Sequence, residues 1–491
     1  MIARILVAGL AGAIFFILVA RLLPHVSYLG LVNALQILIT IAALLSNLGL
    51  STSTNRFMSY YIGAGKDDLA KRVGTLVFWI GFVSSVTISL ALFLSAHYLA
   101  TTLFHQISYF HFIQLASIDA FFFSMVYLLT FILLSLQQFR KLAIILILNS
   151  TIRFTAAFVL LALGEGISGI VIGFCIGDSI SLINLVYVLR HQIGRPSRSI
   201  LNGIRALFRY SLPLFGADTL TYFSLNVDYY LVLILSNLSV AGIYSPAVFI
   251  ATMLGTLGGA FEQTLVPYFS RMFSKGGIES LKVFSELGSR YLFLFYFPIG
   301  FATLSSIYPI ITGIFGQRYI DSIYPSVVLV LGLTLTSVGL IFNSVLKSVG
   351  HTNVFLTSSS IAIIVQLIMS IGTIPYIGAL GAAIARSVAY VIMFIIPAYK
   401  LREIGGLHYD HIALRKGLLG SVTMASIIFI LNIYLFIPYY LPMNLSIGLL
   451  SYLIFLRFTR ALNLQDFKII NKILSGKLKS IILVITRLVV R

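Results

Sequence analysis

Charged residues, and acidic residues above all, are scarce in this chain of 491 residues. Asp and Glu number 14 against 33 Lys and Arg, and the four types together make up only 10% of the sequence. Soluble globular domains carry about 25% charged residues, so this composition excludes an ordinary soluble protein. The single cysteine, Cys175, excludes an intrachain disulfide and gives no information about the redox compartment.

Motifs for catalysis and nucleotide binding are also absent from the sequence. There is no Gly-x-x-x-x-Gly-Lys-Ser/Thr phosphate loop and no grouping of His, Cys and carboxylates at the spacing of metal ligands. The eight histidines are scattered, and His408 and His411 share a loop that we expect to be solvated. We therefore predict no enzymatic activity, no metal and no cofactor. An ion gradient, the membrane potential or a substrate gradient would have to supply energy.

Apolar residues dominate instead, at 59% of the chain with a mean hydropathy of +1.03. Apolar stretches of about 20 residues, long enough to cross a bilayer, follow one another along almost the whole sequence. They are continuous rather than alternating, which favours helices over a barrel. We predict an all-α integral membrane protein of about 14 transmembrane helices. Their approximate ranges are 5–22, 32–59, 73–98, 109–136, 142–163, 168–189, 211–235, 243–269, 285–306, 324–346, 354–374, 379–399, 417–437 and 443–459.

The formal net charge of +19 is distributed unevenly along the chain. Lys and Arg concentrate in every second loop, with Arg21 and Arg318 as the exceptions, which is the positive-inside pattern. It predicts a multi-pass protein of the cell membrane with both termini in the cytoplasm. The basic charge then matches anionic lipid head groups and not nucleic acid. Residues 463–491 read as a basic amphipathic helix on the inner surface, with a short buried helix or a frayed end as the alternative.

An internal repeat divides the chain. Gly166-Ile-Ser-Gly169 matches Gly378-Ala-Leu-Gly381 at an offset of 378 − 166 = 212, and Gly30 matches Gly242 at the same offset. Each repeat holds six spans, so the halves run the same way through the membrane, an arrangement typical of transporters. The predicted parts are an N-terminal lobe, 1–190; a basic cytoplasmic linker, 191–209; a C-terminal lobe, 210–402; two additional helices, 403–462; and the tail, 463–491.

Ionisable residues inside the predicted spans are candidates for function, because burying a charge in a membrane is costly. Arg153 and Arg386 lie deep in their spans, and Arg56 and Arg290 lie near inner ends. Arginine binds phosphate bidentately, so these residues could hold a phosphate in a hydrated cavity. Alternatively, Arg153 pairs with Asp178, and Arg56 and Arg290 snorkel to the head groups. The acidic candidates, which could couple transport to an ion, are Asp119, Asp178, Asp218, Asp228 and Glu262; Asp228 could equally cap a helix end.

Polar residues form a stripe on one face of the second span. They recur at spacings of three, four and seven, and the seventh and eighth spans repeat the feature. Such stripes line a hydrated cavity, or they pack helices through small polar groups. The candidate residues are Asn33, Gln36, Thr40, Asn47 and Ser51, with Thr221 in the seventh span and Thr252 and Gln263 in the eighth.

Two stretches resemble a known family. Ala20-Arg-Leu-Leu-Pro-His-Val-Ser-Tyr28 and Arg209-Tyr-Ser-Leu-Pro213 are similar to the openings of the two halves in the polysaccharide-transport branch of the multidrug/oligosaccharidyl-lipid/polysaccharide (MOP) exporter superfamily. The resemblance implies two six-helix lobes that form a V around a cationic cavity, plus two extra helices. It places the family's first-helix arginine at Arg21, although Pro24 stands where the family usually has glycine.

The resemblance further implies a flippase that moves polyprenyl-phosphate- or polyprenyl-diphosphate-linked oligosaccharide outward by alternating access. The expected partners are this lipid-linked substrate, membrane lipids and a coupling ion, H⁺ or Na⁺. We expect a monomer that associates with glycan-assembly enzymes. Two rivals stay open, a cation-coupled multidrug exporter of the same superfamily and an integral-membrane glycosyltransferase or ligase. The short, nearly uncharged outer loops argue against the second rival.

Overall fold

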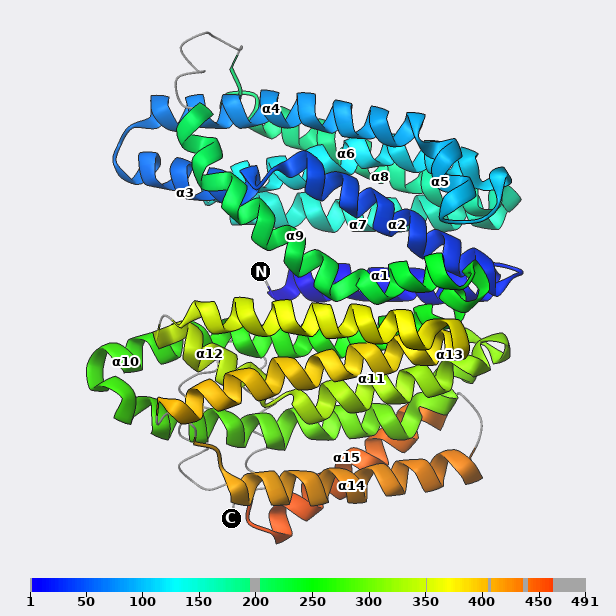
Figure 1. The fold of residues 1–491 in the computed structure, drawn as a ribbon, viewed down its shortest axis with the longest axis vertical. Helices are drawn as coiled ribbons and strands as arrows, with labels where there is room; N and C mark the ends of the chain where they lie inside the picture. Colours follow the sequence, from blue (N-terminus) through cyan, green and yellow to red (C-terminus); the bar gives the residue numbers. More distant parts are fainter. Residues whose placement is uncertain (1, 195–203, 350, 405–407, 436–439, 462–491) are drawn as a thin grey trace. The chain divides into compact units, whose positions relative to one another are not determined.

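The fold was analysed in a computed structural model, which describes residues 2–194, 204–349, 351–404, 408–435 and 440–461. Throughout these ranges the chain is helical and contains no strand (Figure 1). The linker residues 195–203 and the tail from 462 onward, for which a cytoplasmic linker and an amphipathic helix were predicted, lie outside the described residues. The chain forms two compact units, residues 1–242 and 243–491. The lobe boundaries predicted from the repeat stay a prediction.

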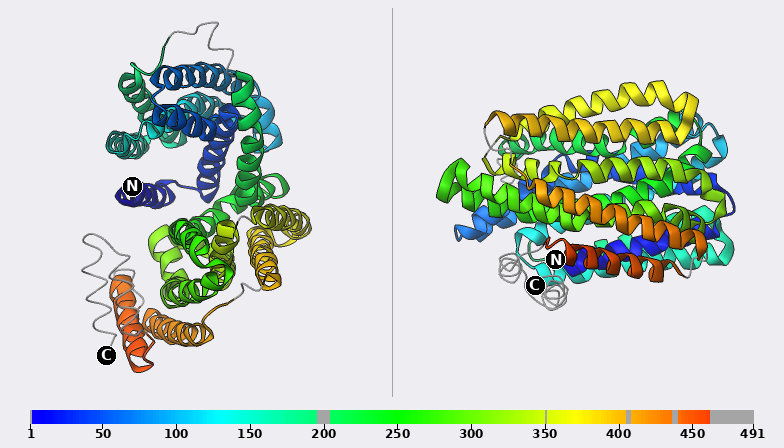
Figure 2. Two further views of the ribbon diagram at one scale, coloured as in Figure 1. Left: turned by 90° about the vertical axis from the view of Figure 1, so that its left-hand side faces the viewer. Right: turned by 90° about the horizontal axis from the view of Figure 1, so that it is seen from below.

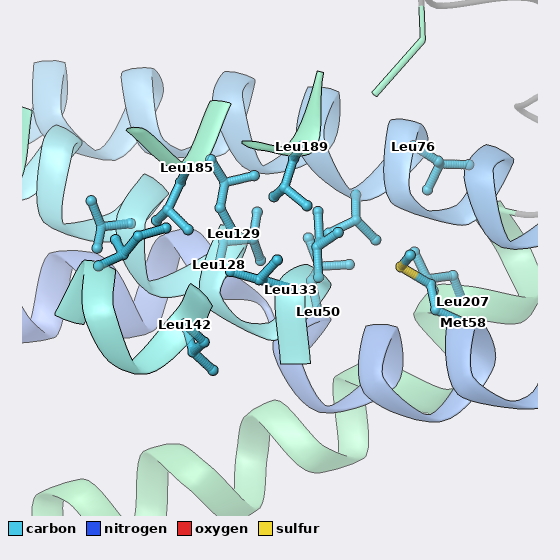
Figure 3. Packing of buried hydrophobic residues seen from close by; sticks show 14 residues of the cluster. Leu50, Met58, Leu76, Leu128, Leu129, Leu133, Leu142, Leu185, Leu189 and Leu207 are labelled. Carbon is cyan, nitrogen blue, oxygen red and sulfur yellow. The ribbon is translucent and has the colours of Figure 1, made fainter. Parts of the chain in front are cut away.

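The first unit consists of helices that pack side by side, several of them seen nearly end-on in Figure 2. In chain order they are α1 (Ile2–Leu22), α2 (Val26–Asn47), α3 (Leu50–Gly63), α4 (Asp67–Leu94), α5 (Ala96–Thr102), η1 (Ile107–Tyr109), α6 (Phe110–Ser135), α7 (Phe139–Leu160), η2 (Leu161–Glu165), α8 (Gly166–Leu189) and α9 (Ile204–Leu235). A cluster of fourteen buried residues forms the core near the end of this unit that carries Met58 and Leu189 (Figure 3).

The second unit contains most of α10 (Leu238–Pro309), which begins at the end of the first unit. After it come η4 (Ile310–Phe315), η5 (Gln317–Ser322), α11 (Ile323–Thr336), α12 (Gly339–Val349), α13 (Thr352–Glu403), α14 (His411–Tyr434) and α15 (Leu441–Phe458). Two cores form here, one around Phe293 and Phe342 and a smaller one where α14 and α15 meet α10.

Ten helices in the described residues are long and apolar enough to cross a membrane. Two of these ranges, 139–189 and 353–403, each contain two predicted spans joined by a tight turn. In α10 the membrane-length stretches are 238–259 and 285–315, close to the predicted spans 243–269 and 285–306. The multi-pass helical fold is confirmed, and the count of fourteen stays a prediction.

The repeat appears in the backbone at its two best-matching glycines. Gly166 has φ 56° and ψ −135°, and Gly378, 212 residues later, has φ 53° and ψ −127°. A side chain strongly disfavours this conformation, so glycine is needed at both turns. The same turn at the same repeat position indicates that α7 with α8 and the two halves of α13 are equivalent hairpins.

The predicted second span differs from the structure because it is broken. Leu48 and Gly49 adopt φ values of 49° and 70°, which end α2 and begin α3. The side chain of Asn47 bridges the break: its Nδ2 donates to Ser51 Oγ, and its Oδ1 accepts from the Ser51 amide, both at 2.9 Å. This buried pair supplies partners for groups that the helix break exposes. The predicted span 324–346 is likewise divided between α11 and α12.

Candidate functional site

Three neighbouring helices of the first unit bring ionisable side chains together in its interior. Asp119 lies in α6, Arg153 in α7 and Asp178 in α8, each well inside its helix. The α7–α8 hairpin can close tightly because Gly177 faces Arg153: a Cβ on Gly177 would lie only 2.5 Å from Arg153 Cα. This close approach sets the Arg153 side chain beside the carboxylate of the next residue, Asp178.

Arg153 is held by both carboxylates. Its Nη1 donates to Asp178 Oδ2 at 3.0 Å, and its Nη2 lies 3.6 Å from Asp119 Oδ2. Asn149, one turn earlier in α7, donates its Nδ2 to Asp178 Oδ1 at 2.7 Å and to Ser181 Oγ at 2.8 Å. The pairing of Arg153 with Asp178, which the sequence left open, is therefore present, and Asp119 extends it to a cluster of three charged groups.

Aromatic rings complete the surroundings of this cluster. The Arg153 guanidinium lies 4.2 Å from the centroid of Phe174 and 5.3 Å from that of Phe123. A cation over a ring face is stabilised by the ring quadrupole, more strongly where water is excluded. Arg153 is only 9% exposed and both aspartates are 0% exposed. Sequence reasoning missed Asn149 and the two rings; the spacing of Asn149 four residues before Arg153 could have indicated the first.

Arg290 occupies a different site, in the second unit. Its Nη2 donates to the carbonyl of Ala461 at 2.9 Å, and its Nε lies 3.8 Å from Asp410 Oδ2. Asp410 also caps α14, accepting from the Ala413 amide at 2.8 Å. Arg290 thus ties α10 to the start of α14 and to the residues that follow α15, a contact that the sequence did not predict.

The other predicted arginines lie on three other helices. Arg386 is buried in α13 at 5% exposure. Arg56 is exposed on α3, with its guanidinium 5.9 Å from the ring of Phe57, and Arg21 is exposed in the last turn of α1. Their assignment to a phosphate site stays a prediction.

The polar stripe of the second span falls on α2 and α3, where its members have unequal surroundings. Asn33, Gln36 and Thr40 are half-buried, and Thr40 Oγ1 donates to the Gln36 carbonyl at 2.8 Å. Asn47 and Ser51 are buried and bonded to each other. Tyr222 of α9, a residue not singled out in the sequence, lies near Thr40 and Tyr230.

The remaining candidates are scattered or lack described side chains. Asp228 is buried in α9, and Thr252 is exposed on α10. The side chains of Asp218, Thr221, Glu262 and Gln263 are outside the described set, so the roles predicted for them stay predictions.

Outside the membrane-length stretches of α10, the Glu279 carboxylate accepts from Lys282 Nζ at 2.8 Å. This hydrogen bond and the adjacent charge lower the pKa of Glu279. Among the described side chains, no three of the types His, Cys, Asp and Glu gather closely enough to hold a metal ion.

The described residues form ten membrane-length helices, and ion pairs lie buried between three of the helices, a combination typical of membrane transporters. The sequence matches the polysaccharide biosynthesis protein family over residues 18–324, well over half of its length. The chain belongs to this family. No curated protein matches it significantly.

Solved structures with the same fold are transporters. An inward closed structure of the lipid II flippase MurJ superposes with a TM-score of 0.72 at 17% identity, covering 93% of this chain and 98% of that one. An inward-facing multidrug resistance MATE family transporter of the MOP superfamily gives 0.66 at 16% identity, covering 82% and 95%. A MOP superfamily transporter from Pyrococcus furiosus gives 0.55 at 17% identity, covering 82% and 94%. At 16–17% identity these three matches show that this chain has the same fold.

Proposed function

We propose that this protein is a flippase that carries a polyprenyl-phosphate- or polyprenyl-diphosphate-linked oligosaccharide from the cytoplasmic to the outer face of the cell membrane. Membership of the polysaccharide biosynthesis family carries the proposal. The likeness in fold to a lipid II flippase over 93% of the chain supports a substrate of this kind, a glycan on a lipid. Both termini lie in the cytoplasm in this proposal, since the basic loops then face inward.

The proposed mechanism is alternating access of a cavity that binds the phosphate through arginine and the sugar through polar side chains. Arg386 is the leading phosphate ligand because it is buried at 5% exposure, where a charge-assisted hydrogen bond is strong. Arg56, Arg290 and Arg21 are further candidates. Arg153 is already paired with two carboxylates, so it could bind phosphate only if the phosphate displaced one of them. The half-buried Asn33, Gln36 and Thr40 of α2 would face the sugar.

Reconstitution tests the proposal directly. Purified protein in proteoliposomes is given a fluorescent polyprenyl-diphosphate-linked sugar, and its movement between leaflets is followed by a membrane-impermeant quencher. We expect protein-dependent transfer. Because hydrogen bonds to charged groups are worth about 1.5–3 kcal/mol, Arg386→Ala should slow transfer about tenfold or more. Exposed Arg72→Ala is the matched control, with no change expected. An absence of transfer by the wild-type protein would refute the proposed function, and an unchanged rate for Arg386→Ala would refute its phosphate role.

A second candidate is export of organic cations. The likeness in fold to a multidrug transporter and the excess of carboxylates over guanidinium at Arg153 favour it. The same vesicles loaded with ethidium decide between the two: uptake or release of ethidium without transfer of the lipid-linked sugar would establish the exporter.

A further inference from the structure

Asp119 is buried without the hydrogen bonds that usually stabilise an ionised carboxylate. Its exposure is 0%, and neither of its oxygens accepts a hydrogen bond from an N–H or O–H group of the described residues; the Cys175 thiol and the Asp178 carboxyl lie beside it. The closest cationic atom, Arg153 Nη2, is 3.6 Å away. An ionised aspartate in this setting loses its hydration and gains few interactions in return, so its charged form is destabilised.

Asp178 is equally buried but has a different environment. Its two oxygens accept separately, from Asn149 Nδ2 at 2.7 Å and from Arg153 Nη1 at 3.0 Å. Donors that point at a carboxylate favour its charged form. The negative charge that balances Arg153 therefore resides on Asp178.

If Arg153 balances Asp178, no positive charge of the cluster remains to balance an ionised Asp119. Two ionised aspartates and one guanidinium would give the cluster a net charge of −1 inside the membrane, where an uncompensated charge is costly. Cys175 is the other titratable neighbour, and its thiol points to the Leu115 carbonyl at 3.9 Å.

The remaining elements that pack on α6 do not supply a compensating cation. Helix α2 contains no Asp, Glu, Lys, Arg or His. The charged groups of α4 lie in its first two turns, and those of the other elements are surface groups or outer-end phenols. These groups are Asp67, Asp68, Lys71 and Arg72 of α4, Arg56 of α3, His97 of α5, and Tyr109 of η1 with its neighbour Tyr28; the phenols Tyr60 and Tyr61 lie near the end of α3, and Tyr98 is exposed on α5.

The neighbouring atoms suit a proton better than a metal cation. Hard cations such as sodium need several oxygen ligands. Here the guanidinium of Arg153 occupies the space beside both carboxylates, and Asn149 directs its nitrogen to Gly177, Asp178 and Ser181, so no amide oxygen is offered. A proton needs only one lone pair of Asp119.

We infer that Asp119 is protonated in this conformation and that its exchangeable proton is the coupling ion of transport. The first part stands on the geometry alone, and the second rests on the proposed function. Binding transfers a proton from water to an Asp119 oxygen and forms one O–H bond, so the cluster becomes neutral; release returns the proton to water and leaves a charge of −1.

Infrared spectroscopy of the full chain in lipid tests the first part. At neutral pH the wild type should show the C=O stretch of a buried protonated carboxylic acid, shifted in D₂O. Asp119→Asn should abolish this band, and exposed Asp67→Asn should leave it unchanged. Absence of the band from the wild type, or its persistence in Asp119→Asn, would overturn the assignment.

The charge balance of the cluster predicts the infrared band of two further variants, and a purely structural role of Asp119 would predict neither. Asp178→Asn should also lose the band, because Asp119 then ionises and pairs with Arg153. Arg153→Gln should roughly double the band, because two carboxyls then need a proton each. Melting temperatures in sodium chloride and in choline chloride test for a bound metal cation. A higher melting temperature in sodium chloride for the wild type, but not for Asp119→Asn, would indicate bound sodium and overturn the inference.

The transport assay tests the second part. A pH gradient across the vesicles should change the wild-type transfer rate several-fold, and Asp119→Asn should transfer at one rate with or without it. A wild-type transfer rate that is the same with and without the pH gradient would overturn the coupling role. If the wild type moves no lipid-linked sugar, the proposed function fails, while the infrared result still decides where the proton resides.

Discussion

Replacing Arg153 by methionine removes the only cation from a cluster with two buried carboxyls. The change also removes one hydrogen bond of 3.0 Å and two contacts with aromatic rings. Hydrogen bonds between membrane helices contribute at most about 1.7 kcal/mol, whereas breaking a buried ion pair costs about 3–5 kcal/mol. We expect the free energy of unfolding to fall by about 3–5 kcal/mol, because the lost charge balance outweighs the lost hydrogen bond.

Equilibrium unfolding in mixed micelles measures this change, with the single tryptophan, Trp79, as the fluorescent probe. Asp178→Asn alone should cost less, since Asp119 can replace Asp178 as the partner of Arg153. The double variant Arg153→Met, Asp178→Asn leaves one neutral carboxyl and should be more stable than the sum of the single effects by 1 kcal/mol or more, on the order of couplings between contacting residues. Additive losses, or a loss for Arg153→Met no larger than for exposed Arg72→Met, would refute the charge argument.

Three further predictions concern packing and the linker. Gly177→Leu should destabilise the first unit by about 1–3 kcal/mol or more in the same assay, because its Cβ meets the backbone of Arg153, whereas Gly372→Leu, with no atom within 4 Å, should have no effect. Asn432→Leu removes buried bonds to the Ser305 carbonyl and the Asn444 amide and should lower the melting temperature, at a cost of about 1–2 kcal/mol. Thr75→Val removes the 2.8 Å bond from the Gly194 amide and should speed tryptic cleavage of the linker.

Hydropathy, charge bias and the repeat predicted the fold class because each reflects a constraint that acts along the sequence. Lipid requires long apolar helices, and a repeat encoded twice produces the same turn twice, as Gly166 and Gly378 illustrate. The break at Leu48 and Gly49 was missed although Gly49 is a usual signal of a helix end, because apolar residues continue on both sides of it. Its buried bridge, from Asn47 to Ser51, looked like part of a polar stripe.

The contents of the candidate site were harder to predict than the fold. Arg153 and Asp178 could be matched because they lie at similar depths in consecutive antiparallel helices. Asp119 is on a third helix, and nothing in a single sequence fixes how that helix is rotated. Arg290 and Asp410 pair across 120 residues of chain, and their contact depends on how α14 returns to α10.

The repeat also locates the difference between the halves. Adding 212 to the positions of Asp119, Arg153 and Asp178 gives Leu331, Val365 and Tyr390, so the second repeat has no ionic cluster at the equivalent place. Uncharged residues therefore occupy the equivalent positions of the second repeat, which suggests apolar replacements for the cluster of the first.

Uncharging the whole cluster at once separates stability from coupling. Buried ion groups can be replaced by apolar residues of similar volume without loss of stability, so Asp119→Leu, Arg153→Met and Asp178→Leu together should unfold within about 1–2 kcal/mol of the wild type. Asn149 keeps its bonds to Gly177 and Ser181. The triple variant should still move the lipid-linked sugar down its own gradient but no longer respond to a pH gradient. A triple variant that is stable and still driven by the pH gradient would place the coupling proton elsewhere.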